Sequence, residues 1–224
     1  MIGRALDADI SFAWVAGDSV YGVGDLEMAL RRTGKGFVLG VNANHWFYSW
    51  RPDVMWVGEA REIIKTLPDE AWVRCSAGHG TKGERWYDWL YCPMADLHAS
   101  EYADTLTGTW TRGLLVRRNP ADGDLRYFIT WCPQGTPLET LARVEGARWR
   151  IEEGFETAKN EFGLDHNETR SWHGWHRHVS LVMLAHAMMA AVRSQANVLA
   201  LKKRPLPTRK SLSSGQFRKS VASS

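Results

Sequence analysis

Three charged residues in the last third of the chain lie on one face of a predicted helix. Arg148, Glu152 and Lys159 are separated by four and then seven positions. At about 3.6 residues per turn, these spacings place all three within a ~40° sector. Two chemistries fit such a stripe. It can be a solvent-exposed ladder of ion pairs, or a catalytic carboxylate beside cations that bind phosphate.

A second carboxylate, Asp18, follows a short apolar segment near the start of the chain. Residues 12–22, FAWVAGDSVYG, predict a buried strand that runs out to Asp18 and then turns. Residues 24–34 predict an amphipathic helix, and residues 36–44 predict a second buried strand. A strand, a helix and a strand of these lengths predict a parallel pair joined by a right-handed crossover. Asp18 should then lie at the C-terminal edge of the sheet, where α/β folds bind ligands.

Asp18 and Glu152 together suggest a site for divalent magnesium. Magnesium prefers oxygen ligands and keeps several of its waters. Two such ions about 4 Å apart activate a water or a hydroxyl group in phosphodiester cleavage. Arg148 and Lys159 would then bind the phosphates of the cleaved strand, the arginine bidentately and the lysine as a point charge.

The remaining chain divides by its patterning. Residues 45–126 alternate short aromatic runs with turns, which predicts a β-rich insertion, and residues 119–123, NPADG, predict a turn. Residues 125–133 predict a strand, and residues 136–163 are largely helical and end at Gly163. A further helix is expected near residues 175–197, and its apolar face comprises Leu181, Met183, Leu184, Met188 and Val192. The expected boundaries are 1–44 for a strand–helix–strand core, 45–126 for the insertion, 127–200 for a C-terminal helical part of the core, and 201–224 for a tail.

Composition places the chain among soluble proteins. It is 44% hydrophobic and 24% charged, and its three cysteines form no CxxC pair, which argues against a zinc ribbon and fits a reducing compartment. The start lacks the apolar core of a signal peptide. The apolar stretch 179–192 is too short to span a bilayer. A cytoplasmic protein without membrane contact is expected.

The net charge of +3 comes from the end of the chain. Residues 201–224 carry seven lysines and arginines and no acid, which leaves 21 basic against 25 acidic residues in the first 200. A strongly basic fold is therefore absent, and any phosphate-binding surface must be local. The tail itself is either a disordered end or a phosphate-binding arm.

Several segments resemble DDE transposases of the IS4-like and IS701-type insertion-sequence groups. Residues 148–159, RWRIEEGFETAK, resemble that group's Y-(2)-R-(3)-E-(6)-K signature, and the following residues, NEFGLDHNETRSWHGWHRH, resemble the C-terminal part of the IS701-type family. WVAGDSVYG, which contains Asp18, resembles the segment of the second catalytic aspartate. SAGHGTKGERWYDW resembles a glycine-rich stretch of the insertion domain. The four segments occur in the family's order over residues ~10 to ~195.

The resemblance implies an α/β fold with a ribonuclease H-like core, a β-rich insertion and C-terminal helices. It also implies magnesium- or manganese-dependent cleavage and strand transfer at transposon ends and target DNA. By position, Asp18 and Glu152 would be the second and third acids of the catalytic triad and the metal ligands. Arg148 and Lys159 would occupy the phosphate-binding positions of the signature. The implied partners are double-stranded DNA and a second transposase chain, either a copy of this one or a full-length transposase, in the nucleoid.

The sequence departs from the family in three places. Glu145 stands at the signature tyrosine, where it replaces a phosphate-contacting hydroxyl with a repelling charge. His79 stands where the glycine-rich stretch has an aspartate. No counterpart of the first catalytic aspartate precedes Asp18, because Asp7 and Asp9 are too close to it. We therefore expect a partial core that lacks its N-terminal strands, an incomplete two-metal site and little activity from this chain alone.

Further DNA contacts are expected from exposed basic and aromatic residues. Lys82 belongs to the glycine-rich stretch, and RSWHGWHRH mixes arginine with aromatics as a DNA-facing loop does. The resemblance suggests that an insertion tryptophan stacks on a displaced base. The candidates are Lys82, Arg170, His176, Arg177, Trp86 and Trp110.

Two other functions fit parts of the same pattern. A glycoside hydrolase also uses two carboxylates and many tryptophans, and the chain has twelve tryptophans. A remnant without catalysis would bind DNA or an intact transposase and interfere with it. Sensitivity of any nuclease activity to chelators, or DNA binding that weakens steeply with salt, separates the glycoside hydrolase from a transposase. The remnant is tested by mixing it with an intact relative, where no loss of transposition would count against interference.

Overall fold

The computed structural model describes residues 2–22, 24–50, 56–80, 83–102 and 106–202. The chain divides into two compact units, Met1–Gly154 and Phe155–Ser224. The first unit contains the β-sheet, and the second is helical. Helix α5 (Trp149–Phe162) begins in the first unit and ends in the second.

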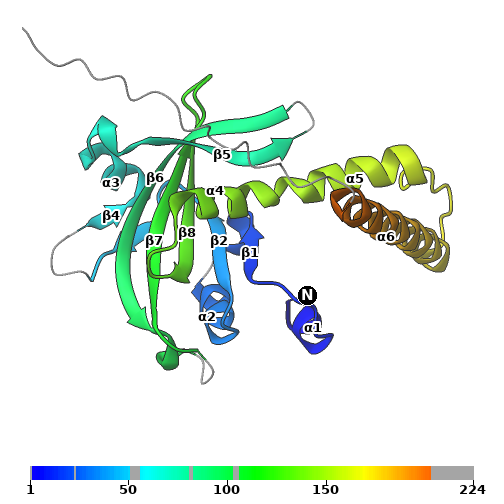
Figure 1. The fold of residues 1–224 in the computed structure, drawn as a ribbon, viewed down its shortest axis with the longest axis horizontal. Helices are drawn as coiled ribbons and strands as arrows, with labels where there is room; N and C mark the ends of the chain where they lie inside the picture. Colours follow the sequence, from blue (N-terminus) through cyan, green and yellow to red (C-terminus); the bar gives the residue numbers. More distant parts are fainter. Residues whose placement is uncertain (1, 23, 51–55, 81–82, 103–105, 203–224) are drawn as a thin grey trace, which may run out of the picture. The chain divides into compact units, whose positions relative to one another are not determined.

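A six-stranded mixed sheet forms the centre of the first unit, with the strand order β1-β2-β8-β7-β6-β5 (Figure 1). Strands β1 and β2 are parallel, and every other neighbouring pair in this sheet is antiparallel. A separate antiparallel pair joins β3 and β4. The strands are β1 (Trp14–Gly17), β2 (Gly36–Val41), β3 (Trp46–Tyr48), β4 (Val57–Glu59), β5 (Val73–Gly80), β6 (Gly83–His98), β7 (Thr109–Arg118) and β8 (Leu125–Pro133).

Helices flank the strands and connect them. Besides α5 and α6 (Trp172–Lys202), the α-helices are α1 (Ile2–Asp7), α2 (Gly24–Arg32), α3 (Ala60–Ile63) and α4 (Leu138–Ala147). Short 3₁₀ turns are η1 (Ser19–Tyr21), η2 (Ile64–Thr66), η3 (Asp69–Ala71) and η4 (Ala99–Glu101). These elements confirm the expected mixed α/β architecture with C-terminal helices.

The predicted strand–helix–strand unit is present. β1 pairs in parallel with β2 from Trp14 opposite Gly36 to Gly17 opposite Leu39, and α2 connects them. All six residues of β2 are buried, as a strand covered on both faces requires. Asp18 therefore lies at the C-terminal end of β1, as the sequence predicted.

Side chains alternate between two apolar layers, one on each face of the sheet. One layer contains Leu30 of α2 with Phe37, Leu39 and Trp131, all at most 1% exposed. The other contains Val38, Trp89 and Phe128, and helix α4 covers them with Leu141 and Ala142. The sheet therefore fixes which residues of each strand point toward α4.

Helix α4 approaches β5 at Gly146. A Cβ atom at this position would lie 1.8 Å from the carbonyl oxygen of Ala77, so only glycine permits the contact. Arg85 reinforces it, because its Nη2 donates to the carbonyl oxygens of both Ala77 and Gly146, at 3.0 and 2.8 Å. This close packing buries the adjacent residue Glu145.

The region predicted as a β-rich insertion does form strands, β3 to β7. Three of them, β5, β6 and β7, continue the sheet of β1, β2 and β8 through hydrogen bonds between β7 and β8. The turn over residues 119–123 connects β7 to β8 as expected, with Gly123 at φ +74°. The domain boundaries at 44/45, 126/127 and 200/201 stay predictions, and the tail from residue 203 lies outside the described residues.

The predicted helical stretch 136–163 is divided into α4 and α5 at Arg148. The backbone N–H of Arg148 donates to Glu145 O, and that of Ile151 donates to Arg148 O. Both bonds span three residues rather than four, so the chain tightens here into a 3₁₀-like turn. No glycine or proline stands at 148, so no breaker residue in the sequence marks the division.

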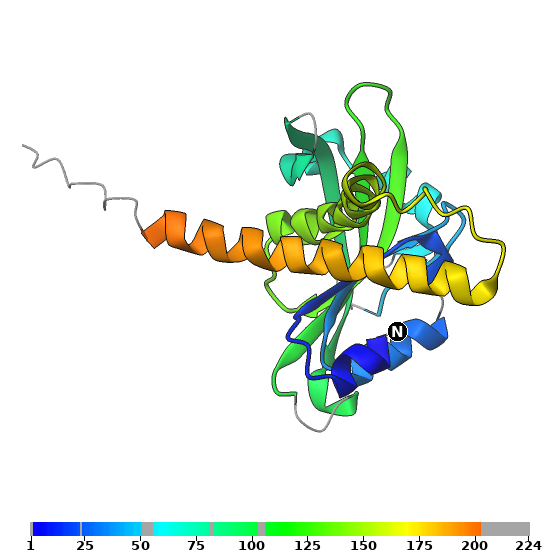
Figure 2. The same cartoon turned by 90° about the vertical axis from the view of Figure 1, so that its right-hand side faces the viewer.

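The second unit contains the end of α5 and the long helix α6. Gly163, with φ +65°, ends α5 as predicted, and the ring of Phe162 packs edge-on against His186 at 5.9 Å. A ring nitrogen of His178 lies 3.0 Å from Gly163 O. Figure 2 shows α6 as one unbroken helix (yellow to orange), and its bounds, Trp172–Lys202, exceed the predicted 175–197.

The apolar face predicted for this last helix is not buried. Its residues Leu181, Met183, Leu184, Met188 and Val192 are 49–62% exposed. Over Trp172–Asn197, α6 is long and apolar enough to cross a membrane. The length argument made for residues 179–192 therefore does not hold for the whole helix, although length and composition alone do not identify a membrane segment.

Candidate functional site

A hydrogen bond from the next residue's backbone holds the Asp18 side chain at the end of β1. Its Oδ1 accepts a hydrogen bond from the Ser19 N–H at 2.7 Å and so caps the short turn η1. The neighbouring strand β2 allows this turn to lie close, because a Cβ atom on Gly40 would stand 2.8 Å from Ser19 N. Asp18 is exposed, so its carboxylate faces solvent at the C-terminal edge of two parallel strands.

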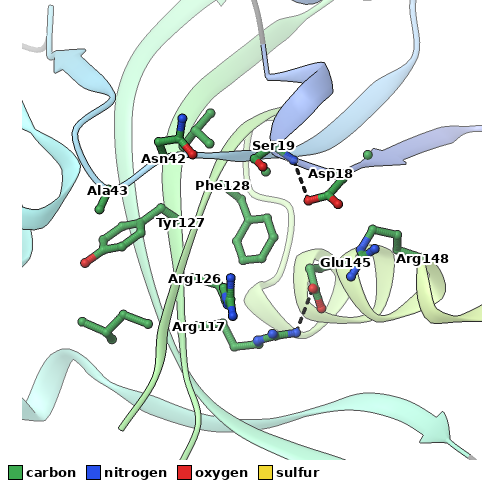
Figure 3. Close-up of a pocket in the computed structure, with 14 residues that line it drawn as sticks. Asp18, Ser19, Asn42, Ala43, Arg117, Arg126, Tyr127, Phe128, Glu145 and Arg148 are labelled. Carbon is green, nitrogen blue, oxygen red and sulfur yellow. Dashed lines mark hydrogen bonds and ion pairs between the residues drawn. The ribbon is translucent and has the colours of Figure 1, made fainter.

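A polar pocket of about 440 Å³ opens beside Asp18 (Figure 3). Its wall comes from the ends of β1 and β2, the facing ends of β7 and β8, and helix α4. Three guanidinium groups and two carboxylates line it, together with backbone and smaller side chains. The charged residues are Asp18, Arg117, Arg126, Glu145 and Arg148.

Glu145 is the buried acid of this pocket. It is 5% exposed, and its Oε1 accepts a hydrogen bond from Arg117 Nη1 at 2.8 Å. Burial raises the pKa of Glu145, and the charges of Arg117, Arg148 and Arg85 partly offset that rise. Among the described residues, its Oε2 has no hydrogen-bond partner. Glu145 is thus an ion-pair partner of Arg117, a contact that the sequence did not reveal.

Arg148 and Glu152 form the ion pair expected of the charged stripe. Arg148 Nη1 lies 3.5 Å from Glu152 Oε1, with side-chain exposures of 31% and 45%. Arg148 lines the Asp18 pocket, whereas Glu152, one turn further, does not. The surface ion pair is therefore present, and a cation shared by Asp18 and Glu152 stays a prediction.

The other predicted basic contacts lie elsewhere. Lys159 is exposed on α5, beyond the point at which the chain divides into two units. Arg170, His176 and Arg177 are exposed in the second unit, where His176 packs against Trp172 at 4.1 Å. Lys82 lies outside the described residues. Their DNA contacts stay predictions.

The two tryptophans proposed for base stacking differ in exposure. Trp86 is 51% exposed on β6, so its ring can meet a ligand. Trp110 is 8% exposed and stacks on Trp131 with ring centroids 5.6 Å apart. The expectation for Trp110 is corrected: its ring is part of the core, because it faces the α2 side of the sheet.

The pocket offers oxygen donors suited to magnesium. Magnesium takes one or two carboxylates and keeps waters in its other positions. Asp18 supplies one exposed carboxylate at this pocket. Within the described part of the chain, no group of three or more His, Cys, Asp or Glu side chains converges as a ready metal site. The residues fit a hydrated divalent ion with few protein ligands.

A mixed sheet with an acid at a strand end and three arginines around it defines a site for phosphate-containing substrates. A family model described as a transposase DDE domain matches residues 3–188, and the chain belongs to this family. Membership implies a role in DNA transposition, DNA binding and the use of a divalent metal. A search of curated proteins found no match.

Proposed function

We propose that this chain acts on DNA ends through a divalent metal held at Asp18 and Glu152, as a member of the IS4-like and IS701-type transposase group. The position of Asp18 carries the proposal: it stands at the C-terminal end of a parallel strand and shares a pocket with Arg148 of the signature. Magnesium or manganese would be the cofactor, and it would activate a water or a hydroxyl group for attack on a phosphodiester. Arg148 would bind the phosphate bidentately.

The chain alone is proposed to be weakly active at most. Of the acids before Asp18, Asp7 ends α1 and Asp9 lies in the following turn with φ +52°, so neither stands on a strand of the sheet. Two acids rather than three would then hold the metals, and the two-metal site would lack a bridging ligand. A second transposase chain, in the cytoplasm at the nucleoid, would be the natural partner.

Iron-directed cleavage of the protein tests this metal site without requiring DNA cleavage. With hydrogen peroxide and ascorbate added, Fe²⁺ bound in place of Mg²⁺ reduces the peroxide to hydroxide and a hydroxyl radical, and the radical cuts the backbone near the ion. We expect cuts near residues 18 and 152 that excess Mg²⁺ suppresses and that Asp18→Asn abolishes. Asp25→Asn, an exposed acid in the first turn of α2, is the control and should leave the cuts unchanged. Cuts near 18 without cuts near 152 would remove Glu152 from the site.

The non-catalytic alternative predicts a different result in a plasmid-nicking assay. A remnant without catalysis would bind DNA or an intact transposase. Added Mg²⁺ would not cause it to nick supercoiled plasmid. The family match removes the glycoside hydrolase alternative. Metal-dependent nicking that is lost in Asp18→Asn would exclude the remnant.

A further inference from the structure

Two arginines face each other directly across β7 and β8 at the rim of the Asp18 pocket. Arg117 and Arg126 are register partners, and both line the pocket. Directly opposed side chains in an antiparallel pair have Cβ atoms roughly 4.5–5.5 Å apart, and like charges in this position repel. An anion placed between them would remove the repulsion.

On the opposite face of the same sheet, an acidic side chain lies between two arginines, which is the arrangement expected where no ligand binds. There, Asp88 of β6 is the register partner of both Arg74 and Arg118. It lies 2.5 Å from Arg74 Nε and 3.3 Å from Arg118 Nη2, so one row of the sheet alternates cation, anion, cation. On the pocket face, the next row places Arg117 beside Arg126 with no acid between them.

The present ion pairs of Arg117 and Arg126 do not use all of their hydrogen-bond donors. Arg117 donates from Nη1 to Glu145, while its buried Nε has no partner among the described residues, nor has Glu145 Oε2. The Arg117 guanidinium lies 4.5 Å from the Tyr87 ring centroid, which fixes its plane. Arg126 pairs at 2.9 Å with Asp124, and both side chains are more than half exposed, so that pair is weak and exchangeable.

We propose that Arg117 and Arg126 form a DNA phosphate subsite on the sheet wall of the Asp18 pocket, with Glu145 as the positioning residue of Arg117. The inference rests on the proposed function, because the phosphate is that of the DNA backbone. Guanidinium groups bind phosphate oxygens bidentately, and two of them on neighbouring strands can hold one group from two sides. Arg148, the C-cap residue of α4, lines the same pocket from the helix side.

The test is the salt dependence of DNA binding, measured by fluorescence anisotropy with a double-stranded oligonucleotide and no metal. Each phosphate contact contributes about −0.9 to the slope of log affinity against log salt. Arg126→Gln and Arg117→Gln should each weaken binding and make the slope shallower by about that amount. Arg126 is exposed, so its variant should fold normally. Arg117→Lys should keep most of the slope, because the charge remains.

Arg118→Gln and Arg74→Gln are the matched controls. They remove the same side-chain type from the opposite face and should leave the slope unchanged. An unchanged slope in both Arg117→Gln and Arg126→Gln, with circular dichroism showing a native fold, would overturn the subsite. So would an equal loss in the controls, which would indicate only a diffuse charge effect.

The test of Glu145 as a positioning residue must separate the loss of its hydrogen bond to Arg117 from the loss of its negative charge. Glu145→Gln keeps an oxygen that accepts from Arg117 and removes a negative charge, so DNA affinity should be equal or higher. Glu145→Ala removes the acceptor and should lower affinity toward that of Arg117→Gln. If both variants gained affinity equally, the carboxylate would act only by repulsion, and its positioning role would be rejected.

Two further outcomes separate this inference from the proposed function. DNA binding with the expected arginine effects, but without iron-directed cuts at Asp18, would sustain the subsite and reject the metal site. Absence of DNA binding by the unaltered chain would reject both. Displacement of DNA by inorganic phosphate at constant ionic strength, with no arginine effect on the salt slope, would assign the pocket to free phosphate instead.

Discussion

Glu145 on helix α4 and Asp88 on strand β6 are two acids whose environments shift their pKa values in opposite directions. Burial raises the pKa of Glu145 above its ordinary value. The hydrogen bond from Arg74, followed by the smaller contribution of Arg118, lowers the pKa of Asp88. A raised pKa means that the folded state holds the proton more tightly than the unfolded state, and a lowered pKa means the reverse.

The free energies of unfolding of Glu145→Gln and Asp88→Asn, each compared with the unaltered chain, should therefore change with pH in opposite directions. As pH rises from below the ordinary glutamate pKa through the raised one, the unaltered chain loses stability relative to Glu145→Gln. As pH falls through the lowered pKa of Asp88, the unaltered chain loses stability relative to Asp88→Asn. Urea unfolding across the acidic range measures both differences. Parallel trends for the two variants would contradict the opposite environments.

The two tryptophans first grouped as base-stacking candidates should separate in mutagenesis. Trp110→Ala removes a ring that is 8% exposed and should lower the free energy of unfolding by about 3–5 kcal/mol. Trp86→Ala removes a 51% exposed ring and should change it by less than about 0.5 kcal/mol. If Trp86 stacks on a base, its loss should weaken DNA binding by about 1–3 kcal/mol. Chemical denaturation and anisotropy titration check the two effects.

Among the elements, the turn after β1 depends on a close approach to β2. Asp18 can adopt its position because Gly40 has no side chain to meet the Ser19 backbone. Other elements depend equally on contacts distant in sequence, such as α4 on β5 at Gly146.

Gly40→Ala should displace the Asp18 turn. The added Cβ would lie 2.8 Å from Ser19 N and 3.1 Å from the Asp18 carbonyl carbon, so the backbone must move. We expect a loss of about 1–3 kcal/mol in unfolding free energy and weaker iron-directed cutting at residue 18. Gly24→Ala is the control, because nothing lies within 4 Å of its Cβ. Normal cutting in Gly40→Ala would show that the turn tolerates the methyl group.

Local signals in the sequence predicted the elements that depend on local physics. The parallel strands, α2 and the end of α5 followed from apolar runs, periodicity and Gly163. The division at Arg148 was missed because hydrogen bonding rather than a breaker residue produces it. Arg117 and Arg126 were missed because only the pairing of β7 with β8 brings them together. Glu145 stood out in the sequence only as a departure from the signature tyrosine, and its pairing with Arg117 depends on the packing of α4.

Across the whole molecule, the three cysteines lie in the two apolar layers, Cys92 on the α2 side of the sheet and Cys75 and Cys132 on the α4 side. All are buried and free, and burial raises the pKa of each, that of Cys92 to about 12. The absence of a CxxC pair in the sequence argued against a zinc ribbon and fitted a reducing compartment, and burial in the structure predicts that the thiols react slowly. The exposure of α6, in contrast, had no sequence signal, because an apolar stripe does not reveal what covers it.

Thiol titration should report the integrity of the sheet. With a chromogenic disulfide reagent at neutral pH, we expect negligible reaction of the native chain, because thiolate is scarce and access is blocked. All three cysteines should react after denaturation. Rapid reaction of one thiol in the native state would show that its strand opens readily.

The six residues that connect β7 to β8 determine which arginines lie opposite each other. Asn119 N–H donates to Asp124 O and Gly123 N–H to Asn119 O, and this geometry aligns Arg117 with Arg126. Since successive residues of a strand point to opposite sides, adding or deleting one loop residue could turn Arg126 away while leaving every charged side chain in place. The length of this loop would then be under the same selective constraint as the two arginines. Insertion or deletion of one codon there would abolish the phosphate subsite although both arginines remained.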